Sequence, residues 1–317
     1  MKKRLIDTGK GTLLCGILNI TPDSFSDGGC YDSVQAALDQ AQYLIEQGVA
    51  MLDVGGESTR PGSHYVEVEE EIVRVVPVIK ALRKYCDLPI SIDTWKSQVA
   101  DAALAAGADY VNDITGLLGD SQMARVAKKH EAGLILMFNA TLMRPHHSSA
   151  KIFPKFGNEQ VFSQKELASF ENLSILELMD HFFDRSLKRA EDAKISKETI
   201  LLDPGIGFGL THLENLQLVD QLKELKAKSF PIFLGVSRKR FLVKLIEDVG
   251  YPADPGSEEG FFNRDLASAF VSAIAAREGV AVLRVHDPYL HRMAVTVGQS
   301  IEDTSRIVDM NLRQYDK

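Results

Sequence analysis

Short apolar runs recur along the chain, and most of them end on a polar residue that precedes a loop and a helical pattern. The clearest example is the stretch 89–97, where β-branched residues end at Asp93 and a helical pattern opens at Ser97. A run of this kind predicts a buried strand that leads into a helix, with a charged side chain at the exit of the strand. If such strands lie parallel and side by side, their terminal polar groups lie on one face of the fold.

The same unit is repeated eight times. We expect strands at 12–20, 51–54, 89–93, 109–112, 134–137, 199–203, 231–236 and 280–285. We expect helices at 33–47, 67–84, 97–106, a stretch ending at 130, 175–194, 213–226, 264–278 and 290–307. Strict alternation indicates a parallel sheet with right-handed crossovers, and eight units close into a barrel. The sequence therefore predicts an α/β fold, a single (β/α)8 TIM barrel domain that spans residues 1–317.

The main rival to a barrel is an open, doubly wound sheet, which usually carries a glycine-rich nucleotide loop after its first strand. The run GIGFGL at 205–210 lacks the third glycine of G-x-G-x-x-G, and no P-loop pattern occurs in the sequence. Two long connections, 139–174 and 248–262, follow predicted strands. We expect both to lie on the active face as lids or flexible segments.

Composition excludes several classes of protein. Of the 317 residues, 45% are hydrophobic and 25% are charged, which is typical of a globular protein with a large core. The formal charge of −8 argues against a nucleic-acid partner, and no apolar run is long enough for a membrane span. The charged start at 1–10 lacks an apolar signal region, so we expect a cytoplasmic protein. The three cysteines suggest neither a disulfide framework nor a zinc site, and Cys15 reads as a buried small hydrophobe.

Polar residues stand at nearly every predicted strand end. They are Asn19, Asp53, Asp93, Asn112, Asn139 (after Phe138), Asp203, the run Ser237–Lys239, and Arg284 with His286. A single Asp or Asn after a strand is more often a turn former or a helix cap than a catalytic group. The nearly complete set, with cations on two neighbouring strands and carboxylates on others, favours a site at the carboxyl ends of the strands.

The set divides by chemistry. Hydrogen-bond acceptors and an amide suit a flat, nitrogen-rich heterocycle, and they are offered by Asp93, Asn112 and Asp203. Cations suit a phosphate or diphosphate, and they are offered by Lys239, Arg284 and His286, which Arg60 on the second loop could join. No Ser-His-Asp order, Cys-His pair or H-E-x-x-H motif indicates covalent or zinc chemistry.

Six blocks resemble the signature of the dihydropteroate synthase family. They are CGILNITPDSFSDGG (15–29), LDVGGESTRPG (52–62), SIDT with NDITG (91–94 and 112–116), LDPGIGF (202–208), GVSRK (235–239) and RVHD (284–287). They cover nearly the whole predicted barrel in the right order. The resemblance implies a transferase of folate biosynthesis, which joins 6-hydroxymethyl-7,8-dihydropterin diphosphate to 4-aminobenzoate and releases pyrophosphate. It also implies Mg²⁺ as the cofactor and a homodimer formed through the final helices.

The resemblance also implies roles for individual residues. The pterin pocket falls on Asp93, Asn112, Asp203 and Lys239. The diphosphate site falls on Asn19, Thr59, Arg60, Arg284 and His286, with the metal at Asn19. The aminobenzoate site falls on Phe25, Ser26, Thr59, Pro61, Phe208 and Ser237. The groups expected to act in catalysis are Asp23, Asp93, Lys239 and Arg284.

The chain departs from the family pattern at two positions, and two alternative functions are considered. Many family members have His where this chain has Phe138 and Lys where it has Leu210. Neither position is central to the roles above, but both leave the wall of the pocket and its basic character open. A corrinoid-dependent methyltransferase domain binds a pterin in a similar barrel, but it does not need the run Ser237–Lys239. A non-catalytic relative would be expected to have lost Asn19 or the Arg284 group. The acidic run 67–71 reads as the solvated start of a helix.

Overall fold

The computed structural model describes residues 3–20, 30–157, 160–226 and 229–308. Eight parallel strands form one sheet in the order β6-β5-β4-β3-β2-β1-β8-β7. The strands are β1 (Leu13–Asn19), β2 (Met51–Gly55), β3 (Ile90–Asp93), β4 (Tyr110–Asp113), β5 (Gly133–Met137), β6 (Ile200–Asp203), β7 (Phe233–Leu234) and β8 (Val282–Val285). An isolated bridge between Leu202 and Ile232 joins β6 to the segment that leads into β7. The strands therefore curl into a nearly closed barrel, and the predicted (β/α)8 fold is confirmed.

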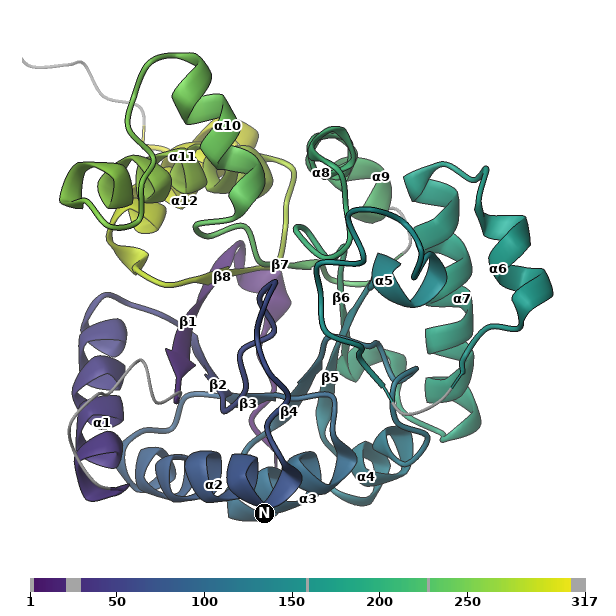
Figure 1. Cartoon of the computed structure of the whole chain (residues 1–317). Coiled ribbons are helices and arrows are strands. Elements are labelled where there is room, and N and C mark those ends of the chain that lie inside the picture. The colour runs from purple at the N-terminus through teal and green to yellow at the C-terminus, as the bar shows by residue number, and fades with distance from the viewer. Residues whose placement is uncertain (1–2, 21–29, 158–159, 227–228, 309–317) are drawn as a thin grey trace, which may run out of the picture.

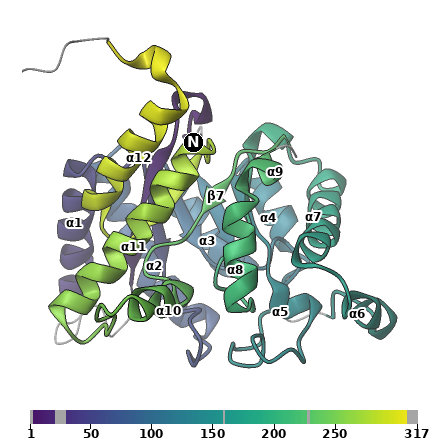
Figure 2. The same cartoon turned by 90° about the horizontal axis from the view of Figure 1, so that it is seen from above.

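Helices surround the strands on all sides (Figure 1). They are α1 (Cys30–Glu46), α2 (Val68–Tyr85), α3 (Ser97–Ala106), α4 (Met123–Lys129), α5 (Ala140–Met143), α6 (Gln164–Phe170), α7 (Ile175–Asp192), α8 (His212–Asp220), α9 (Leu222–Lys226), α10 (Arg240–Asp248), α11 (Glu258–Arg277) and α12 (Pro288–Glu302). Short 3-10 turns lie at Thr8–Lys10, Lys197–Thr199 and Thr304–Arg306. In two views α11 lies beside α12, and α6 lies on the outer side of α7 (Figures 1 and 2).

Four helical segments differ from the prediction. The connection 139–174 contains α5 and α6, and α6 begins with a capping box between Ser163 and Glu166. The expected helix 213–226 is two helices that meet at Gln221. The helix expected at 264–278 starts six residues earlier, where Ser257 caps it, and α10 was not predicted. We assigned no element to residues 240–247, although Phe241, Leu242 and Ile246 form a buried helical face.

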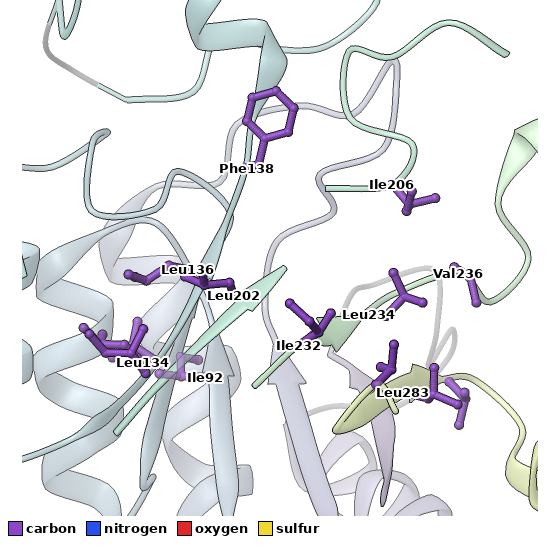
Figure 3. Packing of buried hydrophobic residues seen from close by; sticks show 14 of the residues in the cluster. Ile92, Leu134, Leu136, Phe138, Leu202, Ile206, Ile232, Leu234, Val236 and Leu283 are labelled. Atoms are coloured by element: carbon purple, nitrogen blue, oxygen red, sulfur yellow. The ribbon is translucent and has the colours of Figure 1, made fainter. Parts of the chain in front are cut away.

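Two apolar layers follow from the alternation of side chains along the strands. The inward residues near the amino ends fill the barrel and include Cys15, Met51, Tyr110, Ile135, Leu201, Phe233 and Val282. The outward residues pack against the helices, as Figure 3 shows for Ile92, Leu134, Leu136, Leu202, Leu234 and Leu283. Because side chains alternate with a period of two, the next inward positions on β2, β4, β6 and β8 are Asp53, Asn112, Asp203 and Arg284. The polar residues therefore lie directly above the layer of apolar side chains that fills the barrel interior. Within the described ranges, no helix is long and apolar enough to cross a membrane.

Candidate active site

Strand register brings three of the predicted site residues into one row. Asn19 of β1 is level with Gly55 of β2, Gly55 with Asp93 of β3, and Asp93 with Asn112 of β4. A methyl group placed on Gly55 would lie 3.7 Å from a carboxylate oxygen of Asp93 and 3.8 Å from the amide oxygen of Asn19. The glycine therefore leaves the space between Asn19 and Asp93 open for a ligand.

Arg284 links two carboxylates inside the barrel. Its Cα is level with Cys15, near the amino end of β1, so its long side chain runs toward the mouth. Nε donates to Asp53 Oδ2 at 2.5 Å, and Nη2 donates to Asp93 Oδ2 at 2.8 Å. Asp53 also accepts from Asn112 Nδ2 at 3.1 Å. The fully buried Asp53 is thus a site residue that we predicted at a strand end without assigning it a role.

Burial shifts the pKa values of three residues at the strand ends, Asp93, Asp203 and Lys239. It raises the pKa of Asp93 to about 7, against the opposing charge of Arg284. It raises the pKa of Asp203 to about 6, although the backbone N–H of Gly205 donates to that carboxylate at 2.8 Å. Burial also lowers the pKa of Lys239 to about 8, opposed by the charge of Asp203. Shifts of this kind, caused by desolvation and specific charged neighbours, are typical of functional sites.

The cationic side of the mouth differs in one respect from the prediction. Burial, aided by the charges of Arg238, Arg284, Arg60 and Lys239, lowers the pKa of His286 well below its ordinary value. His286 is therefore neutral at pH 7 and contributes a ring nitrogen, which lies 3.0 Å from Ser237 Oγ. The positive charge comes instead from the arginines and the lysine that surround it.

Two further arginines reinforce this side. Arg238 pairs with Asp265 through both its Nε and Nη2 atoms, at 2.6 and 2.9 Å. Arg264 donates from Nη2 to the backbone carbonyl of Arg238 at 2.7 Å. Arg60, on the loop after β2, is exposed. Its charge nevertheless acts on both His286 and Lys239, which places it with the predicted cationic group.

A buried ion cluster fixes the loop after β2, which carries Thr59, Arg60 and Pro61. Lys96 Nζ pairs with Glu71 at 2.7 Å and also with Glu57, and it lies 4.2 Å from the ring centroid of Tyr65. Glu71 is 1% exposed. The expectation that the run 67–71 is a solvated helix start is therefore wrong for Glu71, which faces inward and pairs with Lys96.

Phe208 is the one of the two aromatic residues expected at the aminobenzoate site that falls within the described residues. Lys239 Nζ lies 4.6 Å from the centroid of its ring. Ser237, expected at the same site, is buried beside His286. Asp23, Phe25 and Ser26 lie outside the described residues.

The departures at Phe138 and Leu210 do not alter the polar cavity. Phe138 packs edge-on against Phe182 of α7, with ring centroids 5.4 Å apart, and it is fully buried among the outward-facing residues of the sheet (Figure 3). Leu210 belongs to the same apolar cluster. Both side chains contribute to packing between the barrel and its helices. Inward-facing Met137, not Phe138, lies at the mouth.

The fold and the site together define a class: a (β/α)8 barrel with buried carboxylates and cations at the carboxyl ends of its strands, an arrangement that suits a polar heterocycle next to an anionic group. Comparison with known proteins agrees. The family model described as "Pterin binding enzyme" matches residues 15–286. The dihydropteroate synthase of Synechocystis is 39% identical over 283 residues, which are 89% of this chain and 88% of that protein.

Solved structures give the same result. A Clostridium difficile dihydropteroate synthase, crystallised in the presence of pteroic acid, matches with a TM-score of 0.78 and 37% identity, over 94% of this chain and 99% of that one. The Xanthomonas albilineans synthase with 4-aminobenzoic acid matches with a TM-score of 0.75 and 34% identity, over 94% and 95% of the two chains. The chain belongs to the dihydropteroate synthases of the pterin-binding enzyme family.

Proposed function

We propose that the chain condenses 6-hydroxymethyl-7,8-dihydropterin diphosphate with 4-aminobenzoate to give 7,8-dihydropteroate and pyrophosphate. The main support is the pair of hydrogen bonds from Arg284 to Asp53 and Asp93 in the barrel mouth. Asn112 also donates to Asp53. In the reaction the C–O bond to the diphosphate breaks, a C–N bond forms, and the amine loses a proton. The named relatives are synthases, so the corrinoid methyltransferase and the non-catalytic relative have no support of their own.

The pterin is the substrate that the buried acceptors suit. Asp93, Asn112 and Asp203 would hold its donor edge, because a buried acceptor without a partner costs free energy and so selects for a ligand that donates. Lys239 would contact the ring or its exocyclic oxygen from the opposite side. Positive charge develops on the pterin methylene as the diphosphate leaves, and ionised Asp93 and Asp203 would stabilise it.

The diphosphate would lie among Arg60, Arg284 and neutral His286. The two arginines would neutralise charge on the leaving group, and the imidazole N–H would donate a hydrogen bond to it. Asn19 fits a Mg²⁺ ion, since Mg²⁺ takes oxygen ligands and is commonly held by one or two protein groups together with substrate phosphates. The open space beside Gly55 leaves the amide oxygen of Asn19 accessible. When bound there, the ion supplies further positive charge to the leaving group. Thr59 would add a hydroxyl donor.

The amine would enter beside Phe208, Pro61 and Ser237, with Phe25 and Ser26 from the first loop as the remaining predicted contacts. Asp23, on the same loop, is the predicted acidic group near the reacting atoms. A closed cover would exclude water, so that the amine and not water attacks the methylene. The expected single domain and the cytoplasmic location stay predictions.

The protein is further proposed to form a homodimer, and exposed apolar residues on α11 and α12 support this. Each of the helices α11 and α12 carries a stripe of apolar residues spaced by four positions or a multiple of four. Every residue in these stripes is at least half exposed: Phe262, Phe270 and Ile274 on α11, and Tyr289, Met293, Val297 and Ile301 on α12. The two helices lie side by side (Figure 2). A contiguous exposed apolar patch indicates a protein interface. Sedimentation of Phe270→Glu should give a monomer, whereas Leu213→Glu, an equally exposed position on α8, should not change the oligomer.

The activity is tested by mixing the two substrates with Mg²⁺ and measuring pyrophosphate and dihydropteroate in equal amounts. Omission of either substrate should abolish the signal. Chelation of divalent ions should abolish it as well, and added Mg²⁺ should restore it. Pyrophosphate release that does not require the amine would contradict the proposal, because it would indicate hydrolysis and not transfer.

A further inference from the structure

The connection between β5 and α7 is built into the mouth of the barrel. Phe156, from this connection, is 3% exposed and packs with Trp95, Ile114 and Met137 from the ends of β3, β4 and β5. Phe153 and Phe208 pack against the same cluster. The part of the connection that carries Phe153 and Phe156 is therefore a fixed wall on one side of the mouth and not the lid or flexible segment that its length suggested.

Phe153 and Phe156 contact the ring of Phe208 from two directions. Phe153 stacks on it with centroids 5.6 Å apart and 27° between the ring planes. Phe156 lies 6.5 Å away at 57°, and Phe153 and Phe156 lie 6.4 Å from each other. These separations fall in the range of favourable aromatic pairs. Three rings thus form a triangle, and Lys239 contacts the Phe208 member of it.

Hydrogen bonds tie the same connection to the turn that follows Phe208. The carbonyl of Gly209 accepts from Arg144 Nη2 and from Ser149 Oγ, each at 2.8 Å. Arg144 also pairs with Glu214 of α8 at 2.6 Å. Both donors precede Phe153, so backbone and ring contacts from one segment together fix the position of Phe208.

A further hydrogen bond reaches the loop after β2. The backbone N–H of Gly62 donates to the carbonyl of Ile152 at 3.3 Å. Gly62 follows Pro61 directly, and Ile152 precedes Phe153 directly. The connection therefore touches both elements of the proposed amine site, Phe208 and the loop that carries Thr59 and Pro61.

From these contacts we infer that Phe153 is a positioning residue for the aromatic amine: its ring holds Phe208 in the orientation that packs against the substrate. The inference rests on the proposed synthase activity. A benzoate ring gains affinity from a fixed aromatic face, because no side-chain freedom is lost when it binds. Of the four predicted pterin contacts, Lys239 approaches this cluster, and it does so at the ring of Phe208. We therefore expect affinity for the pterin diphosphate to depend little on Phe153.

Steady-state kinetics of Phe153→Ala test the inference, with each substrate varied in turn. Loss of one aromatic pair is expected to raise KM for 4-aminobenzoate about tenfold. KM for the pterin diphosphate and kcat should stay within about twofold of wild type, because neither depends on the affinity for the amine. Phe153→Tyr, which keeps the ring, should restore the wild-type KM for the amine.

Phe162→Ala is the matched control. Phe162 belongs to the same connection and is more deeply buried than Phe153, but it packs on Phe170 and Arg185 and not on Phe208. An unchanged KM for the amine in Phe153→Ala overturns the inference, as does an equal rise in Phe162→Ala or for the pterin diphosphate. If wild-type protein releases no pyrophosphate, the proposed activity fails instead, so the two failures are distinguishable.

Discussion

Replacement of Asp53 by Asn tests the electrostatics of the site with little change of shape. Asp53 and Asp93 both accept hydrogen bonds from Arg284, and the negative charge of Asp53 contributes to the raised pKa of Asp93. Wild-type kcat/KM should fall as pH drops through about 7, where Asp93 gains a proton. In the variant the amide oxygen can still accept from Arg284, but the charge is gone.

The magnitude follows from the geometry of the bridge. A like charge on the other side of one guanidinium shifts a neighbouring pKa by about one unit, which corresponds to about 1.4 kcal/mol. Because a nearby anion disfavours ionisation of Asp93, its removal lowers that pKa. The acid limb of the pH profile should therefore move to lower pH by about one unit in Asp53→Asn. The plateau of kcat/KM should fall by at most about tenfold, since a charge-assisted hydrogen bond becomes a neutral one.

The assay is the initial rate of dihydropteroate formation from pH 5 to pH 9 at subsaturating pterin diphosphate. Ser91→Ala is the control, because Ser91 Oγ donates to Asp53 and its removal leaves the charge in place. The acid limb of Ser91→Ala should stay where it is in the wild type. An acid limb that stays fixed or moves to higher pH in Asp53→Asn would show that Asp53 does not act on Asp93.

Three other substitutions separate binding, catalysis and stability. Asp93→Asn should lose most turnover, because a neutral amide cannot stabilise the charge on the pterin methylene; a rate of dihydropteroate formation near that of wild type would exclude this role. Arg60→Ala should lower kcat while the pterin diphosphate still binds in calorimetry, and equal losses of both would mean that its loop is only structural. Lys96→Met leaves the Glu57 and Glu71 carboxylates buried without their shared cation, so urea denaturation should show a loss of about 3–5 kcal/mol. Adding Glu71→Gln to Lys96→Met should recover part of that loss, and no recovery would contradict the pairing.

The strands and their order could be predicted because the barrel depends on local patterns. Each short apolar run is a strand in the structure, and strand alternation directs Asp93, Asn112, Asp203 and Arg284 to one cavity. The signal for Asp53 was also present, since a carboxylate inside an apolar strand requires a partner. Its partner, Arg284, lies far away in sequence, and no local pattern could identify the pair.

Other parts of the site depend on contacts that sequence spacing does not determine. Glu71 looks like its acidic neighbours on α2, and only the fold shows that it faces Lys96. Helices α6 and α7 had a readable signal, because Ser163 and Ser174 each begin a capping box. The path of the chain between them, which takes Phe153 to Phe208, is set by tertiary packing and had no such signal.

The weak pairing between β6 and β7 means that a bound substrate could stabilise the barrel itself. Within the described ranges an isolated bridge joins the two sides of this seam, whereas the other neighbouring strands are joined by ladders. Asp203 lies at the end of β6, and Lys239 follows β7 on the far side. A pterin bound by both residues would link β6 to the segment after β7 and so stabilise the weakest junction of the barrel. Hydrogen exchange of the amides that flank Leu202 and Ile232 should then slow when the pterin binds, and the cylinder would be complete only with its ligand in place.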